Sequence, residues 1–377
     1  MSLDANTSKG LEGVVAATTR LSHVDGEAGE LLIAGYPVAE LAANATFEET
    51  TWLLWHGELP TDAELDEFRA DLAVHRPLPA ATLAIVRECA RARVDPMDAL
   101  RIALGTVSLA SAEPTAIVAI APTIVAAFAR LIAGEEPIAP LTELGHAANY
   151  LYMLSGVMPD AERVRGLETY LNTVVDHGLN ASTFTCRVIT STGSDLVSAV
   201  VGAIGALKGP LHGGAPGPAL ETVFEIGDAS RAERVLRRKI ESGERLMGFG
   251  HRVYKVRDPR ADVLAAAAER LFTRGGDMQL YTLARAVETT ALRLLEEYKP
   301  GRRLQTNVEF YTALLLHGLG LDVPLFTPTF AISRVSGWIA HALEQRAANR
   351  LIRPASEYVG PRDRRWSDRA EVLVHAG

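Results

Sequence analysis

Three histidines stand in segments where side chains could take part in chemistry. His177 lies in VVDHGLNASTF, His212 in GPLHGGAPGP and His251 in LMGFGHRVYKVRDPR. Glycine and proline around His212 favour tight turns in which a ligand can approach the backbone closely. His251 follows two glycines and precedes a run of cationic residues, a composition suited to an anion with phosphate or carboxylate groups. Ordinary structural histidines and a solvated basic face are the alternative interpretation.

A single carboxylate, Glu309, lies in the apolar segment LQTNVEFYTALLLHGLG. With histidine counted as neutral, it is the only charged residue between Arg303 and Asp322. One interpretation makes Asn307 a helix N-cap and places the glutamate at the positive end of the helix dipole. The other is that the carboxylate serves chemistry, because burying an unpaired charge is costly. Histidines, arginines and one carboxylate suit abstraction of a proton beside a carbonyl and stabilisation of the resulting oxyanion.

Other site chemistries lack their sequence signatures. No HExxH motif and no paired His or Cys spacing typical of metal ligands occurs. A serine hydrolase would need a G-x-S-x-G elbow between a strand and a helix, which the chain lacks. GFGHRV follows a helical segment and lacks the third glycine of a dinucleotide-binding loop. The net charge of −8, from 46 acidic and 38 basic residues, does not favour a nucleic-acid surface.

The pattern along the chain predicts a mainly helical protein with a short β segment. The 377 residues, 48% of them hydrophobic, are enough for two or three domains. Residues 11–35 contain β-branched residues and an Asp25-Gly26 turn, which predicts an antiparallel hairpin or meander. Beyond them the pattern is helical almost throughout. Three helix starts are marked by local signals: Thr46 with Glu49, Thr61 with Glu64, and Asp95 before Pro96.

Further helices are predicted at 141–155, 161–175, 181–207, 216–227, 230–241, 259–273, 279–297, 307–317 and 328–347. The uncharged stretch 115–129 is shorter than the roughly 20 residues that a membrane span needs. Because it also contains Pro122, we expect a buried helix pair or a kinked helix. Segments rich in glycine and proline at 208–220 and 317–330 predict the joints of a smaller domain inserted into a larger one. A cleft between the two domains would hold the ligand.

The composition favours a cytoplasmic location. Residues 1–10 contain no basic leader followed by an apolar run, so we expect no secretory signal peptide. The two cysteines, Cys89 and Cys186, form no dense pattern, which suits a reducing compartment. Cys186 lies close to Phe184 and Val188, so we expect it to pack in the core.

Six motifs, in their order and spacing, resemble the citrate synthase family: DHGLNASTF, GPLHGGAP, GFGHRVYKVRDPR, NVEFY, FAISRVSGWIAHALEQ and RLIRPASEYVG. The opening GLEGVVAATTRLSHVDGEAGEL is also similar to bacterial members. The resemblance implies a citrate synthase-like two-domain helical fold. Residues 1–217 and 324–377 would form the large domain, with the β segment at 11–35, and residues 218–323 the small one. It also implies a homodimer or a dimer of dimers, and no metal or redox cofactor.

The resemblance implies condensation of acetyl-CoA with oxaloacetate, followed by hydrolysis of the citryl-CoA thioester. His212 would stabilise the enol or enolate of acetyl-CoA, and His251 would polarise the oxaloacetate carbonyl and deliver a proton. Glu309 would be the base that takes the methyl proton. Close relatives use propionyl-CoA and make 2-methylcitrate, which is the first alternative. A protein that binds the same ligands but has lost turnover is the second.

The resemblance also implies the binding residues. His177 would bind oxaloacetate, and fixed guanidinium groups would bind its carboxylates. The arginines concerned are Arg260, Arg334 and Arg353, the last reaching in from the partner subunit. The implied CoA-binding residues are Leu246, Gly248, Phe249, Gly250, Lys255, which would contact phosphate, and Asn307.

Three positions depart from the family pattern. Glu309 stands where aspartate is common, and its extra methylene adds about 1.5 Å of reach. A displacement of about 1 Å can cost on the order of 10²-fold in rate when geometry is tight. Val174 and Gly178 stand where many relatives have a histidine and a glutamate. We expect these two changes to alter the surroundings of His177 and to leave its oxaloacetate contact in place.

Overall fold

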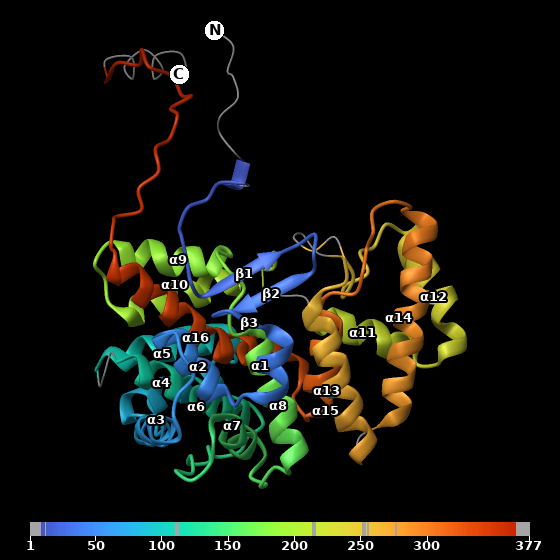
Figure 1. The fold of residues 1–377 in the computed structure, drawn as a ribbon, viewed down its shortest axis with the longest axis horizontal. Helices are drawn as coiled ribbons and strands as arrows, with labels where there is room; N and C mark the ends of the chain where they lie inside the picture. Colours follow the sequence, from blue (N-terminus) through green and yellow to red (C-terminus); the bar gives the residue numbers. More distant parts are fainter. Residues whose placement is uncertain are drawn as a thin grey trace, which may run out of the picture.

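The computed structural model is mainly helical (Figure 1). It describes residues 9–11, 13–109, 113–212, 216–250, 254, 256–275 and 277–366. Within these ranges lie sixteen α-helices and one three-stranded sheet. The predicted fold class, a helical protein with a short N-terminal β segment, is confirmed.

The helices form two groups (Figure 1). The larger group contains α1 (Val38–Asn44), α2 (Phe47–His56), α3 (Asp62–His75), α4 (Ala80–Arg91), α5 (Pro96–Leu104), α6 (Pro114–Ile132), α7 (His146–Ser155), α8 (Ala161–Val174), α9 (Ala181–Ser191), α10 (Leu196–Leu207) and α16 (Phe326–Ala347). The second group contains α11 (Pro216–Ile226), α12 (Ala232–Glu241), α13 (Pro259–Gly275), α14 (Met278–Tyr298) and α15 (Val308–Gly318). Short 3₁₀ helices are η1 (Lys9–Leu11), η2 (Gly105–Leu109), η3 (Ala229–Arg231) and η4 (Val323–Leu325).

The two groups touch through a few helices. In the second group, α13 packs against α1 and α8, α15 against α8, and α11 against α16. Since α8 and α16 belong to the larger group, both groups border the residues that follow α8 and those that precede α15. The domain boundaries predicted from the sequence stay a prediction.

The N-terminal β segment is an antiparallel meander, as predicted. Its strands are β1 (Ser22–Asp25), β2 (Glu30–Ile33) and β3 (Tyr36–Pro37), in the order β1-β2-β3. Ser22 pairs with Ile33, and Asp25 with Glu30. The Asp25 carboxylate accepts hydrogen bonds from two backbone N–H groups of the β1–β2 turn, at 2.9 and 2.8 Å. One carboxylate therefore fixes the shape of this turn.

Local start signals placed several helices correctly. The Thr46 hydroxyl accepts the backbone N–H of Glu49, whose carboxylate accepts that of Thr46 at 2.6 Å, so the predicted capping box begins α2. Asp95 caps α5 by accepting the N–H of Met97 at 2.9 Å. Such caps satisfy backbone donors that have no partner within the helix.

The prediction of one helix over 181–207 is wrong, because the chain forms α9 and α10 there. Between them Gly193 adopts a φ of 85°. The Asp195 carboxylate then accepts the backbone N–H of Ser198 at 2.8 Å and starts α10. Both helices bury much of their length, so the apolar pattern runs through the break. Cys186 in α9 is fully buried, as predicted.

Helix α6 is a single buried helix rather than a pair, with Pro122 inside it. By length and composition it could cross a membrane, but 72% of its most apolar window is buried inside the protein. It packs against α3, α4, α5, α7 and α16. This is the position of a core helix.

Helix α16 runs through the larger group and approaches the chain just before His177. A Cβ atom built on Gly337 would lie 2.2 Å from the Val175 carbonyl oxygen and 3.3 Å from Asp176 Oδ1. Only glycine lets the two backbones come this close. The position of the turn that carries His177 therefore depends on this contact.

We expect the substitution Gly337→Ala to lower the free energy of unfolding by about 1–3 kcal/mol, the usual cost of overpacking a core. Urea unfolding would measure it. Gly166→Ala is the matched control, because Gly166 is buried within α8 and an added Cβ would meet leucine side chains at 3.5 and 3.7 Å. Equal unfolding midpoints for the two variants would contradict the proposed close contact.

Candidate active site

The first turn of α15 carries Glu309. The Asn307 side chain accepts the backbone N–H of Glu309 at 3.0 Å, so the predicted N-cap is confirmed. Burial raises the pKa of Glu309 to about 7; Arg260 and Arg334 oppose this rise, and Asp258 adds to it. A carboxyl group with a pKa near neutrality can both take and release a proton under physiological conditions. The structure thus confirms that Glu309 lies in the first turn of a helix capped by Asn307, and its chemical role stays a prediction.

The segment Leu246–Gly250 runs beside the residues that lead into α15. Gly250 donates its backbone N–H to the Gln305 carbonyl at 2.7 Å, and Asn307 donates its own to the Gly248 carbonyl at 3.0 Å. The Asn307 side-chain amide also donates to the Gly250 carbonyl at 2.8 Å. The Asn307 side chain thus caps α15 with its Oδ1 atom and binds the loop with its Nδ2 group. The predicted CoA-binding residues Leu246, Gly248, Phe249, Gly250 and Asn307 are brought together beside Glu309.

Two glycines in this loop are required by geometry. Gly248 has a φ of 89°, and a Cβ there would lie 3.0 Å from the Phe310 side chain. Gly250 has a φ of 81°, and its Cβ would lie 3.0 Å from Leu304. Left-handed backbone and tight contact together favour glycine at both positions. The loop therefore lies directly on the N-terminal end of α15.

Arg260 and Asp258 form a buried two-point ion pair. The Nε and Nη2 groups of Arg260 donate to the two Asp258 carboxylate oxygens at 3.0 and 2.8 Å. The same carboxylate accepts the backbone N–H of Arg260 at 3.0 Å and that of Val308 at 3.2 Å. Asp258 thus joins the start of α13 to the start of α15. The sequence prediction does not include Asp258, whose only signal is its place before Pro259 at a helix start.

A second buried carboxylate, Glu288 of α14, supports α15 from another side. It accepts hydrogen bonds from the Thr306 hydroxyl at 2.7 Å and the Tyr311 hydroxyl at 2.5 Å. Arg257 and Arg285 donate to it at 2.8 Å each. Arg257 therefore belongs to an internal ion-pair network and not to a solvated basic face.

His177 lies between α8 and α9 and contacts an aromatic residue from the second group of helices. Its Nε2 atom lies 3.1 Å from the Tyr254 hydroxyl. The Arg260 guanidinium carbon lies 5.8 Å from the centre of the Tyr254 ring. Tyr254 thus stands between two residues predicted to bind oxaloacetate. Tyr254 is absent from the sequence prediction, because an aromatic residue in a basic run carries no distinctive signal.

Arg334 projects from α16 into the same region and is fully buried. Its Nε group donates to the Val174 carbonyl at 2.7 Å, and its guanidinium lies 4.6 Å from the centre of the Phe330 ring. Burial lowers the pKa of Arg334 to about 10, with Asp176 opposing the change. The group stays cationic at neutral pH, so it offers a fixed positive charge.

His212 is held as a neutral ring. Burial and the nearby Arg334 lower its pKa to about 4. Its Nε2 atom lies 2.8 Å from the Ser182 hydroxyl and 3.3 Å from the Ser182 backbone N–H, which can only donate. Nε2 therefore accepts, and the ring proton belongs on Nδ1. A neutral imidazole with this tautomer can donate a hydrogen bond to a developing oxyanion. Trp338 fixes the arrangement by donating to the Ser182 hydroxyl at 3.1 Å.

The remaining predicted residues lie elsewhere. His251 and Lys255 are outside the residues that the structure describes. Arg353 is exposed in the segment that follows α16 and leads away from the helices (Figure 1). Among the described residues, no group of three or more His, Cys, Asp and Glu side chains is placed to hold a metal ion.

Comparison with known proteins places the chain in a family. The family model for the C-terminal domain of citrate synthase matches residues 10–355. Citrate synthase from Haloferax volcanii is 41% identical over 96% of this chain and 98% of its own length. 2-Methylcitrate synthase from Mycobacterium tuberculosis is also 41% identical, over 94% of this chain and 91% of its own.

The fold is shared with a solved structure as well. Citrate synthase from Thermoplasma acidophilum, solved in a ternary complex with carboxymethyl coenzyme A and oxaloacetate, matches with a TM-score of 0.88. The identity is 30%, over 97% of this chain and 99% of that chain. Family and fold are those of an acyltransferase that converts the transferred acyl group into an alkyl group. The chain belongs to the citrate synthase family.

Glu309→Gln is expected to raise the melting temperature, and more so at about pH 8.5 than at about pH 5.5. The folded-state pKa of about 7 exceeds the ordinary value of 4.5, so the folded protein binds this proton more tightly than the unfolded chain. Ionisation of Glu309 therefore opposes folding increasingly as pH rises from about 4.5 to about 7. Thermal unfolding at both pH values would measure the effect.

The matched control is Glu40→Gln, because Glu40 also lies in the first turn of a helix but is exposed. We expect its effect on the melting temperature to be small at both pH values. An equal rise of the melting temperature in both variants would contradict the conclusion that burial of Glu309 causes the effect.

Proposed function

We propose that this protein condenses acetyl-CoA with oxaloacetate and hydrolyses the resulting thioester to citrate and CoA. The observation that carries the proposal is the pair of opposite pKa shifts in one region. Glu309 has its pKa raised to about 7, and His212 has its pKa lowered to about 4. Such a pair separates a proton acceptor from a neutral hydrogen-bond donor, the two roles that enolisation of a thioester needs.

In the first step Glu309 takes a proton from the methyl group of acetyl-CoA. Negative charge then develops on the thioester oxygen, where His212 donates a hydrogen bond from Nδ1. Because the imidazole is neutral at working pH, it stabilises this charge without giving up its proton completely. Arg260, Arg334 and His177 hold oxaloacetate so that its carbonyl carbon meets the new nucleophile. By resemblance, His251 polarises that carbonyl and supplies a proton.

We infer that the rotamer of Glu309, rather than a shift of α15, accommodates its longer side chain. The start of α15 is fixed, since Asn307 caps it and Asp258 binds the backbone N–H of Val308. A helix shift that would compensate for one methylene would break these hydrogen bonds. We therefore infer that the acyl site is built for glutamate at this position.

Thiol release from acetyl-CoA, with and without oxaloacetate, tests the proposal on the purified protein. We expect release that depends on oxaloacetate. Glu309→Gln should lower kcat by about 10²–10⁴-fold, the usual contribution of a general base. Glu309→Asp should cost on the order of 10²-fold through lost reach. An Asp variant faster than the natural enzyme would show that the site is not built for glutamate.

2-Methylcitrate synthesis from propionyl-CoA is the second candidate, supported by the 41% identity to the Mycobacterium tuberculosis enzyme. One methylene is worth only about 1–3 kcal/mol of discrimination. Comparing kcat/KM for the two thioesters in the same assay distinguishes the candidates. Tight binding of CoA and oxaloacetate without turnover of either thioester would instead indicate a binding protein. We propose that turnover needs no cofactor and takes place in the cytoplasm.

We further infer that the protein works as a homodimer in which Arg353 of each subunit enters the site of the other subunit. Near the end of α9, Ser191 accepts the backbone N–H of Ile352 at 3.0 Å. Ser182, which contacts His212, lies at the start of α9, about 13 Å away at the rise of an α-helix. Arg353 is thus remote from the site of its own subunit. Exposed apolar residues follow it, as expected for a segment that packs on a partner: Tyr358, Val359 and Trp366.

Mixing two inactive variants tests this arrangement. Arg353→Ala and Glu309→Gln subunits, co-expressed with different tags, are each expected to be poorly active alone. If Arg353 crosses the interface, one of the two sites in each mixed dimer is intact, so purified mixed dimers should recover about half of the natural activity. No recovery in purified mixed dimers would place Arg353 in the site of its own subunit.

A further inference from the structure

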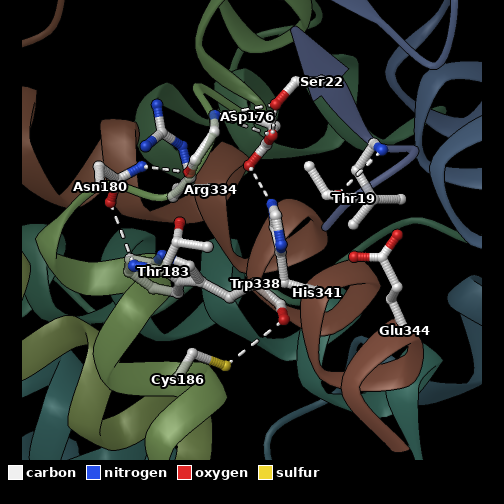
Figure 2. Close-up of polar contacts among 12 residues, drawn as sticks. Thr19, Ser22, Asp176, Asn180, Thr183, Cys186, Arg334, Trp338, His341 and Glu344 are labelled. Carbon is white, nitrogen blue, oxygen red and sulfur yellow. Dashed lines mark hydrogen bonds and ion pairs between the residues drawn. The ribbon is translucent and has the colours of Figure 1, made fainter. Parts of the chain in front are cut away.

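The N-terminal meander is attached to the turn that carries His177. The Ser22 hydroxyl donates to Asp176 Oδ2 at 2.5 Å and accepts the backbone N–H of Gly178 at 2.9 Å (Figure 2). It therefore bridges the residue before His177 and the residue after it. Gly178 has a φ of 62°, and a Cβ there would lie 3.7 Å from Val24 of the same strand. Strand β1 thus lies directly on this turn.

The other oxygen of Asp176 is fixed from α16. Asp176 Oδ1 lies 3.2 Å from His341 Nε2 (Figure 2). Arg187 donates to His341 Nδ1 at 3.0 Å, so the ring proton belongs on Nε2 and faces the carboxylate. Asp176 and His341 are both fully buried. With one oxygen set by α16, the Ser22 hydroxyl decides the environment of the other.

The tip of the meander touches the opposite side of the site. A Cβ built on Gly29 would lie 2.6 Å from Val256 Cγ2 and 3.5 Å from the Arg257 carbonyl oxygen. These residues follow Tyr254, whose hydroxyl lies 3.1 Å from His177 Nε2. In Figure 1 the β1–β2 turn extends toward the second group of helices. The meander therefore touches both neighbours of the His177–Tyr254 contact, one through Ser22 and one through Gly29.

We propose that the N-terminal meander is a positioning element of the oxaloacetate site. Ser22 sets the orientation of His177 through the Asp176–Gly178 turn, and Gly29 lets Val256 and Arg257 lie close enough for Tyr254 to reach His177. The inference rests on the proposed function, in which His177 binds oxaloacetate. Neither Ser22 nor Gly29 is assigned contact with substrate, so both act through His177.

Ser22→Ala is expected to fold, because the Gly178 N–H also donates to Asp176 Oδ2 at 3.2 Å and Asp176 keeps its contact with His341. The orientation of the turn should loosen. We expect KM for oxaloacetate to rise on the order of tenfold, the loss associated with about one hydrogen bond, while kcat at saturation changes little. Ser22→Thr retains the hydroxyl and should restore the natural KM.

Ser198→Ala is the matched control, because its hydroxyl also donates to an aspartate, Asp195, at 2.7 Å, but at the start of α10. It should leave KM for oxaloacetate unchanged. An unchanged KM in Ser22→Ala, or failure of Ser22→Thr to restore a raised KM, would overturn the inference. If the natural protein itself shows no oxaloacetate-dependent turnover, calorimetric binding of oxaloacetate to Ser22→Ala replaces KM as the readout, and the proposed function fails separately.

Gly29→Ala tests the second contact, with Gly35→Ala as its control. Both glycines belong to the meander and adopt left-handed backbone, with φ of 70° and 89°. Alanine should therefore strain both turns similarly. Only at Gly29 would the added Cβ meet other residues, Val256 and Arg257, because no atom lies within 4 Å of a Cβ built on Gly35. We expect similar melting temperatures and a several-fold higher KM for oxaloacetate in Gly29→Ala alone. Equal KM values would show that this contact does not position the site.

Discussion

The carboxylate of Asp258 is the interaction on which the site depends. It accepts hydrogen bonds from the Nε and Nη2 groups of Arg260 and from the backbone N–H of Val308. One buried group thereby positions the Arg260 guanidinium and the helix turn that carries Glu309. A carboxylate this deeply buried is stable only with such partners, because an unpaired charge away from water is costly. The position of the first turn of α15 and that of the Arg260 charge are consequently set together.

Buried carboxylates take opposite roles according to their hydrogen bonds. Burial would raise the pKa of Asp176, but His341, Arg334 and Ser22 outweigh it and hold the pKa at about 2. Asp176 is thus a permanent anion that organises the turn beside it. At Glu309 the effect of burial outweighs the opposing charges of Arg260 and Arg334, and the pKa is raised to about 7. The difference between a structural and a chemical carboxylate lies in the partners and not in burial itself.

Helix α16 supplies much of the fixed framework of the larger group. Arg334, Trp338 and His341 point from it toward the residues between α8 and α9 (Figure 2). Gly337 allows the close approach that these contacts require. From the second group, Tyr254 in the loop before α13 contacts His177 among the same residues. The candidate site therefore combines residues from both groups of helices.

The sequence by itself determined the helical class, the N-terminal meander and many helix starts, because caps and apolar periodicity act within a few residues. Its motifs also marked His177, His212 and Glu309 as candidates. Only the tertiary structure decided the break at Gly193 and the pairs that make those residues functional. The pairs Ser182–His212, His177–Tyr254 and Ser22–Asp176 span 30, 77 and 154 positions. No local pattern encodes such pairs, and the raised pKa of Glu309 exists only once folding has removed water from around its side chain.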